Sequence, residues 1–237
     1  MQRKIKSFLS NMFYPRCCPL CHQILDDQKG MICPQCARSL KPIEGPGCMK
    51  CGKHVGEGQE YCRECTETER KFTQGRGFYV YDERMKVSIL RYKYGGCRSY
   101  GDFYAAAICR YAEKEIRRWQ PDLIVPIPLH KSKRRERGFN QAEYLAERIS
   151  SFYKIPMAAH LVVKVKKTKA QKHLDAKCRR KNLQGVFEVT ERVDGYRILL
   201  LDDVYTTGST MDEIAGCLRE KGAESVYFLT FCSGDNW

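Results

Sequence analysis

Two adjacent carboxylates, Asp202 and Asp203, stand just before a cluster of hydroxyl side chains and a glycine. Such carboxylates accept hydrogen bonds from vicinal sugar hydroxyls, and they hold Mg²⁺ directly or through water. The hydroxyls and the free N–H groups of a following helix N-terminus would bind phosphate, which the helix dipole also attracts. The pattern therefore predicts a site for a phosphorylated sugar. Its phosphate-binding residues would be Thr206, Thr207, Gly208, Ser209 and Thr210.

A strand–helix turn with one capping threonine is the alternative interpretation of this segment. It explains one hydroxyl, but not four hydroxyls, a glycine and two consecutive carboxylates together. The segment instead resembles the signature of type I phosphoribosyltransferases for 5-phosphoribosyl-1-pyrophosphate (PRPP), in which Asp-Asp and Thr-Thr-Gly-x-Thr follow an apolar strand. The resemblance implies bound PRPP with Mg²⁺, and Asp202 and Asp203 as the catalytic carboxylates beside the sugar.

A second stretch joins a predicted strand to a run of cations. Residues 125–130 read Val-Pro-Ile-Pro-Leu-His, and five basic residues lie between 131 and 137. The position of this run after a strand resembles the pyrophosphate loop of the same enzyme class, where cations would neutralise the departing pyrophosphate. A solvated basic loop is the alternative. We expect ligand contact from one or two of these cations, with Lys131 and Arg137 as the candidates.

Fourteen cysteines are many for this length, and nine of them lie within the first 65 residues. Eight form four Cys-x-x-Cys pairs. Because four thiolates close one tetrahedral Zn²⁺ site, we expect two structural zinc ions. Disulfides, or a redox role for one pair, are alternatives, and pairing in chain order is the default over an interleaved arrangement. Cys17, His22 and His54 are expected to be bystanders. The predicted ligands are Cys18, Cys21, Cys33, Cys36, Cys48, Cys51, Cys62 and Cys65.

The chain has 237 residues, of which 43% are hydrophobic, and a formal net charge of +14. Such a charge indicates an anionic partner: nucleic acid, a polyphosphate ligand or a membrane surface. Neither a signal peptide nor an apolar run that could span a bilayer is recognisable, so we expect a cytoplasmic protein with reduced or metal-bound thiols. An amphipathic stripe in residues 1–14 is expected to dock on the protein itself. The alternative is a helix at the inner face of the membrane.

The elements that would position the acid pair alternate between strands and helices. Short apolar strands are predicted at 78–81, 122–127, 161–165, 185–189, 196–201 and 225–231. Helices are predicted at 83–94, 99–119, 138–152, 175–184 and 207–221. This order predicts an α/β fold with a mostly parallel sheet and flanking helices, in which ligands bind beyond the carboxyl ends of the strands. We expect a small zinc-ribbon domain at 1–70 and the α/β domain at 71–237, beginning with a linker at 71–77.

Together these segments resemble the ComF (ComFC-like) family of competence-associated proteins, in which a double zinc ribbon precedes a type I phosphoribosyltransferase-like domain. The resemblance covers nearly the whole chain. Besides the cysteines and the Asp-Asp loop, it rests on Tyr92-Lys93-Tyr94-Gly95, the Pro-Ile-Pro-Leu-His turn, Arg137-Gly138-Phe139-Asn140-Gln141-Ala142 and Gly185-Val186-Phe187. It implies a cytoplasmic protein that handles imported DNA during natural transformation.

Three functions fit these observations. The first is phosphoribosyl transfer from PRPP to an acceptor that the sequence does not name. The second is single-stranded DNA binding through the basic stretch 164–181, which would alternatively close over PRPP, and through nearby aromatic residues. Those aromatic residues lie at helical positions that are more typical of a core: Tyr92, Tyr94, Tyr100, Phe103 and Tyr104. The third is an assembly adaptor whose zinc ribbons dock a competence helicase or another DNA-processing protein.

Overall fold

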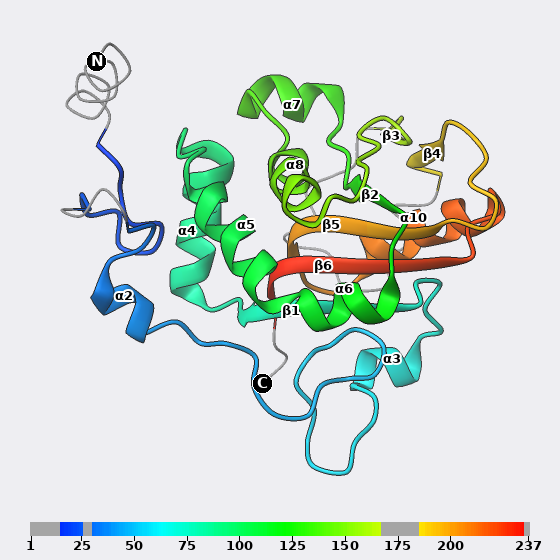
Figure 1. Ribbon diagram of the computed structural model, residues 1–237, viewed down its shortest axis with the longest axis horizontal. Helices are drawn as coiled ribbons and strands as arrows, with labels where there is room; N and C mark the ends of the chain where they lie inside the picture. Colours follow the sequence, from blue (N-terminus) through cyan, green and yellow to red (C-terminus); the bar gives the residue numbers. More distant parts are fainter. Residues whose placement is uncertain (1–14, 26–29, 167–184, 235–237) are drawn as a thin grey trace.

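The computed structural model describes residues 15–25, 30–166 and 185–234, and Figure 1 shows their arrangement. Four parallel strands form the central sheet in the order β1-β6-β5-β2. A separate antiparallel pair consists of β3 (Val162–Lys164) and β4 (Phe187–Val189). The mostly parallel sheet that the alternating pattern predicts is therefore confirmed. The strands of the central sheet are β1 (Gln74–Val80), β2 (Leu123–Pro126), β5 (Arg197–Tyr205) and β6 (Ser225–Ser233).

Strand β5 lies in the interior of the sheet, between β6 and β2. Its residues from Ile198 to Leu201 are each 0% exposed, because apolar layers cover both faces of the sheet. Ile198 and Leu200 pack in one core, whereas Leu199 and Leu201 pack in the other, as the two-residue period of a strand requires. A continuous apolar run is typical of a parallel strand that is covered on both sides.

Helices cover both faces of this sheet (Figure 1). The core on one face takes buried side chains from α4, α5 and α8, and the core on the other face takes them from α10 and the β3–β4 pair. The helices are α2 (Pro34–Arg38), α3 (Arg63–Glu67), α4 (Glu83–Tyr94), α5 (Tyr100–Tyr111), α6 (Glu113–Trp119), α7 (Lys131–Arg137), α8 (Gln141–Tyr153) and α10 (Ser209–Glu220).

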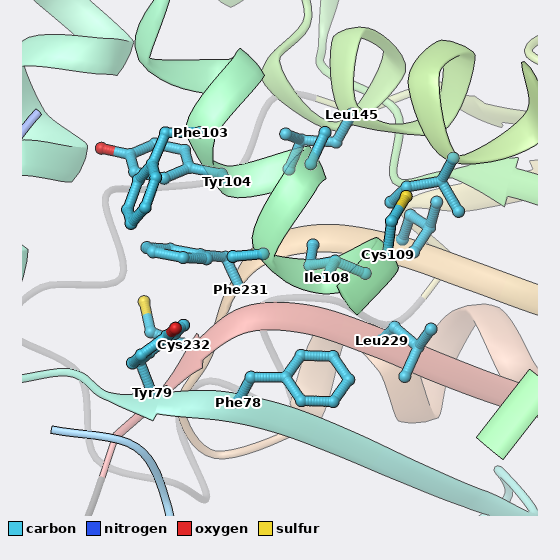
Figure 2. Close-up of a cluster of buried hydrophobic side chains, with 14 of the residues drawn as sticks. Phe78, Tyr79, Phe103, Tyr104, Ile108, Cys109, Leu145, Leu229, Phe231 and Cys232 are labelled. Atoms are coloured by element: carbon cyan, nitrogen blue, oxygen red, sulfur yellow. The ribbon is translucent and has the colours of Figure 1, made fainter. Parts of the chain in front are cut away.

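Aromatic rings fill the core between β1, α5 and β6, as Figure 2 shows. The ring of Tyr104 stacks on that of Phe231 with the centroids 4.2 Å apart, and Phe103 meets the same ring edge-on at 5.7 Å. Of the five aromatic residues considered for DNA stacking, four are buried and only Tyr94 is exposed, by 48%. The expectation that aromatic residues at helical positions form core is therefore confirmed for all of them except Tyr94.

The predicted linker at 71–77 is wrong over its second half, because β1 already begins at Gln74. Its glycines suggest a flexible connection, yet Gly75 lies inside the sheet opposite Phe228 of β6. A Cβ at Gly75 would overlap the buried ring of Phe228. This glycine therefore leaves the space that the Phe228 ring of the neighbouring strand occupies.

Two predicted helices have different bounds in the structure. The helix predicted at 99–119 is divided at the buried residue Ala112, which separates α5 from α6. The helix predicted from residue 138 begins later, because the Asn140 side chain accepts a hydrogen bond from the Ala142 N–H (3.1 Å) and caps α8. The helix predicted at 175–184 and the amphipathic stripe at 1–14 lie outside the described residues.

The basic run after His130 is helix α7, and its interpretation as a loop is wrong. His130 caps this helix, since its Nδ1 accepts a hydrogen bond from the Ser132 N–H at 3.3 Å. None of the α7 residues is buried. The segment therefore lacks the apolar periodicity from which a helix is predicted.

Candidate active site and metal centres

The eight cysteines of the Cys-x-x-Cys pairs form two clusters, paired in chain order as predicted. Within each cluster the sulfur atoms all lie within 4.8 Å of one another, and every cysteine in the described ranges is free of a disulfide. Four convergent thiols suit tetrahedral Zn²⁺, so the clusters are two zinc-ribbon sites with four cysteines each. The first centre consists of Cys18, Cys21, Cys33 and Cys36, and the second centre of Cys48, Cys51, Cys62 and Cys65.

The first centre packs against α4 and α5. Its two buried cysteines belong to the same core as these helices. Ser88 of α4 donates a hydrogen bond to the carbonyl of Pro19 (2.6 Å), and His22 Nδ1 hydrogen-bonds the hydroxyl of Tyr100 on α5. His22 is thus engaged with α5 and lies outside the thiol cluster, as expected for a bystander.

The second centre packs into the opposite core, against the end of β5 and against α10. Its two buried cysteines share that core with Phe72 and Tyr205. Two buried cations, Lys53 and Arg70, stand beside it, and Lys53 pairs with Glu64 at 2.9 Å. A zinc ion with four thiolates carries a net negative charge, so these cations suit a loaded site.

The acid pair lies at the carboxyl end of β5, which extends four residues beyond the predicted end at 201. Asp203 is 2% exposed, and its Oδ1 accepts a hydrogen bond from Lys93 Nζ of α4 at 2.8 Å. Its Oδ2 is buried and has no hydrogen-bond partner among the described residues. Asp202 is half-buried, and its Oδ1 accepts a hydrogen bond from the Asp203 N–H at 2.8 Å.

Burial and nearby charges shift the pKa values of this group. Burial, followed by the charge of Asp203, raises the pKa of Asp202 to about 7. Burial opposes the charge on Lys93, but the two carboxylates outweigh it and raise the pKa of that ammonium group. Burial lowers the pKa of Lys164 on β3, although Asp202 acts in the other direction. Asp202 therefore takes up or releases a proton close to neutral pH.

The predicted phosphate residues form the connection from β5 to α10 and the first two residues of that helix. Gly208 caps the helix with φ +76°, a conformation that glycine adopts at low cost. Thr207 Oγ1 and Ser209 Oγ lie 3.0 Å apart in a hydrogen bond. The chain thus turns directly into a helix of 12 residues, whose first N–H groups lack partners within the helix. Free N–H groups and hydroxyls at one helix end are able to bind an anion. We call residues 206–210, the segment expected to bind phosphate, the phosphate loop.

The structure brings one of the two predicted cations near the acid pair. The charge of Arg137 contributes to the pKa of both Asp202 and Lys93. Its Nη1 donates to Gln141 Oε1 (2.9 Å) and its Nη2 to the Tyr94 hydroxyl (2.7 Å). Lys131 is exposed in the first turn of α7. The structure therefore places Arg137 in the electrostatic environment of Asp202 and shows Lys131 only as an exposed side chain.

Sequence reasoning gave no role in the site to Lys93, and it considered Lys164 only as the first residue of the basic stretch 164–181. Lys93 lies next to the buried Tyr92 on α4 and reaches Asp203 across 110 residues of chain. The signal that could have identified it is its place in the Tyr-Lys-Tyr-Gly motif. Lys164 is the last residue of β3, where its Nζ lies 5.3 Å from the ring centroid of Phe187. No short-range pattern connects either lysine with the acid pair.

Two domain families match parts of this chain. Residues 9–66 match the double zinc ribbon domain family, and residues 99–236 match the phosphoribosyl transferase domain family. Competence protein F of Haemophilus influenzae is 31% identical over 225 residues, which cover 92% of this chain and 96% of the relative. Competence protein ComFC of Bacillus subtilis is 32% identical over 212 residues, 84% of this chain and 82% of the relative.

Two further comparisons concern another relative and a solved structure. The DNA utilization protein YhgH of Salmonella typhi is 31% identical over 225 residues, which cover 92% of this chain and 97% of the relative. A crystal structure of a purine phosphoribosyltransferase from Pyrococcus horikoshii aligns with 57% of this chain and 82% of its own, at 14% identity and a TM-score of 0.33. None of the helices in the described ranges has the length and hydrophobicity that a membrane span requires.

Proposed function

The chain belongs to the ComF (ComFC-like) family of competence and DNA-utilization proteins, and on this premise we propose that it binds PRPP with Mg²⁺ where β5 meets α10 and transfers the phosphoribosyl group. One observation carries the proposal. Two carboxylates lie in the last four residues of an interior parallel strand, and a short stretch of hydroxyls and glycine then leads directly into a helix N-terminus. Ligands of parallel α/β sheets bind at this edge.

The 5′-phosphate would lie on the phosphate loop. Its oxygens would accept hydrogen bonds from the side chains of Thr206, Thr207, Ser209 and Thr210 and from the free N–H groups at the start of α10. Gly208 adopts the positive φ that this turn needs, and a side chain there would collide with the Tyr205 ring. The helix dipole adds a favourable interaction with the negative charge.

The ribose would lie beside the acid pair. The Oδ2 atom of Asp203 is buried without a partner among the described residues, which costs free energy until a donor reaches it, and a ribose hydroxyl is such a donor. Asp202 would accept the neighbouring hydroxyl. The same two carboxylates fit Mg²⁺, which prefers oxygen ligands and would supply charge neutralisation at the pyrophosphate. Lys93 orients Asp203 through its 2.8 Å contact.

The transfer breaks the bond between C1′ of the ribose and the pyrophosphate oxygen. The bonding electron pair leaves with pyrophosphate, where Arg137 and Lys131 would stabilise the added charge. The oxocarbenium-like C1′ that develops would be stabilised by Asp202 and Asp203. A lone pair of the acceptor then forms the new bond to C1′, and the acceptor loses its proton to the surrounding solvent.

Calorimetric titration of PRPP with Mg²⁺ into the full chain tests this proposal. The Asp202→Ala/Asp203→Ala variant should lose binding, whereas Glu113→Ala/Glu191→Ala, a control at two exposed carboxylates, should keep it. Zinc content is measured in parallel, so that a loss of metal is not mistaken for a loss of the site. Unchanged affinity in the acid-pair variant would exclude the ribose assignment. Pyrophosphate release with candidate acceptors would then test turnover.

Single-stranded DNA binding is the second candidate, and the exposed Tyr94 favours it. The guanidinium of Arg137 lies 4.7 Å from the Tyr94 ring centroid, and Lys133 Nζ lies 5.8 Å from it. An exposed ring among cations suits base stacking beside a phosphate backbone. Tyr94→Leu should weaken binding of a fluorescent single strand, and an unchanged anisotropy titration would remove this ring from any DNA surface.

The cellular role, location and partners proposed for this protein rest on its family membership alone. Relatives named for competence and DNA utilization support a role in handling DNA taken up during natural transformation. A cytoplasmic location, at or near the inner face of the membrane, and a competence helicase or another DNA-processing protein as partner belong to this proposal. The division into a zinc-ribbon domain at 1–70 and a transferase-like domain at 71–237 belongs to it as well.

A further inference from the structure

We propose that the second four-cysteine centre is a structural part of the PRPP site, and that Tyr205 is the positioning residue through which it holds the phosphate loop. The proposal rests on the proposed PRPP binding. The first centre has no comparable contact with the loop among the described residues. Loss of the second centre should therefore weaken PRPP binding, while loss of the first should leave it nearly unchanged.

Tyr205 lies between the second centre and the phosphate loop. Its ring stacks on Phe228 at 4.6 Å and meets Phe72 edge-on at 6.4 Å, in the same core as the two buried cysteines. Lys53, two residues after Cys51, holds its Nζ 5.6 Å from the ring centroid. The zinc ribbon therefore contacts one side of the Tyr205 ring.

The other side of Tyr205 supports the backbone of Gly208. A Cβ at Gly208 would lie 2.8 and 2.9 Å from two ring carbons of Tyr205, closer than side chains pack. The Tyr205 hydroxyl is buried and has no hydrogen-bond partner among the described residues, so the ring is held by packing. A shift of the ribbon that moved this ring would move Gly208 and the start of α10 with it.

A second link joins the same centre to the first turn of α10. The guanidinium of Arg70, whose side chain is 3% exposed, lies 3.9 Å from Glu64 and 4.0 Å from Asp212. Glu64 is the residue before Cys65, and Asp212 belongs to the first turn of α10. Asp212 also accepts a hydrogen bond from the Lys71 N–H at 2.7 Å. The ribbon thus contacts both ends of the phosphate loop, at Tyr205 before it and at Asp212 after it.

Two equivalent cysteines offer a matched test. Cys33 and Cys62 are both half-buried, and each precedes a five-residue helix as its N-cap, in the first and second centre respectively. We expect Cys62→Ser to weaken PRPP binding by about tenfold or more, because small displacements of binding groups are costly. Cys33→Ser should stay within about twofold, as distant sites do. The measurements are zinc content and calorimetric titration of PRPP with Mg²⁺ on the full chain.

Equal affinities of the two variants, or a larger loss in Cys33→Ser, would overturn the proposal. If Cys62→Ser fails to fold or keeps its zinc, the ring itself is tested: Tyr205→Phe should keep PRPP affinity within about twofold and Tyr205→Leu should lose about tenfold. Equal PRPP affinity of Tyr205→Phe and Tyr205→Leu would also overturn the proposal.

If the wild type binds no PRPP, the proposed function fails separately, and amide exchange at 206–210 decides the inference. Faster exchange in Cys62→Ser than in Cys33→Ser supports the link, and equal exchange removes it.

Discussion

The two zinc centres have the same four-thiol composition but different surroundings. The first packs on α4 and α5, where its backbone meets Ser88. The second packs at the end of β5 and the start of α10, where Tyr205 and Asp212 connect it to the phosphate loop. Figure 1 shows α2 of the first ribbon at the left, next to α4, and α3 of the second ribbon below β1. A shared metal motif therefore does not imply a shared role, because the role follows from what each ribbon contacts.

The largest expected difference between the centres is in stability. Cys51 is 0% exposed within the core that contains Phe72, whereas Cys21 is half-buried. Loss of a ligand removes zinc-dependent folding free energy, so Cys51→Ser should lower the free energy of unfolding by about 4 kcal/mol, and Cys21→Ser by about half of that. Urea unfolding of the zinc-loaded chains measures both. A larger loss for Cys21→Ser would contradict the expected order of these two equivalent ligand positions.

Helix α4 carries Ser88, which hydrogen-bonds the first ribbon, and, five residues further on, Lys93, which pairs with Asp203. Lys93→Met would leave the buried Asp203 carboxylate without its cation, which should cost about 3 kcal/mol in the free energy of unfolding. Lys93→Met combined with Asp203→Asn should recover most of this loss. If the single and double variants are equally unstable in urea, the ion pair is not the cause.

Protonation of the acid pair, and not of either zinc ribbon, should cause the pH dependence of PRPP binding. Burial raises the pKa of Asp202 to about 7, so the native protein retains a proton that the unfolded chain has already released. This group therefore contributes stability below the ordinary carboxyl pKa, and that contribution is lost as pH rises through about 7. The proposed contacts with ribose hydroxyls and Mg²⁺ require the ionised form of the Asp202 carboxyl group.

PRPP affinity should therefore rise with pH up to about 7, by at most about tenfold per pH unit. Titrations between about pH 6 and pH 8 measure this slope. Asp202→Asn should flatten the slope. Cys33→Ser and Cys62→Ser should both keep it, even though the second is expected to weaken the affinity itself. A slope that disappears in Cys62→Ser would mean that the second centre also supports the ribose half of the site.

Local patterns account for the parts of the molecule that the sequence predicts. The Cys-x-x-Cys spacing determines both clusters, and the apolar run before Asp202 identifies the interior strand, although that strand ends four residues later than predicted. These features depend on residues that are close together in the chain. The family match on residues 99–236 and the parallel sheet confirm the predicted fold class.

The remaining features depend on contacts between distant residues. Lys93 and Asp203 are 110 positions apart, and Lys71 and Asp212 are 141 apart, so no spacing rule links them. Helix α7 is not predicted because none of its residues is buried. Gly75 suggests a linker because the sequence does not show that Phe228 lies against it. Burial and pairing of these residues arise only in the folded chain, so they cannot be predicted from local sequence.

Amide hydrogen exchange of the wild-type chain, with and without PRPP and Mg²⁺, tests the PRPP site most directly. Bound PRPP should slow amide exchange in the phosphate loop and in the first turn of α10, with little change around Cys33 in the first ribbon. If exchange slows only at other sites, or nowhere while calorimetry shows binding, PRPP binds elsewhere and the proposed site is wrong.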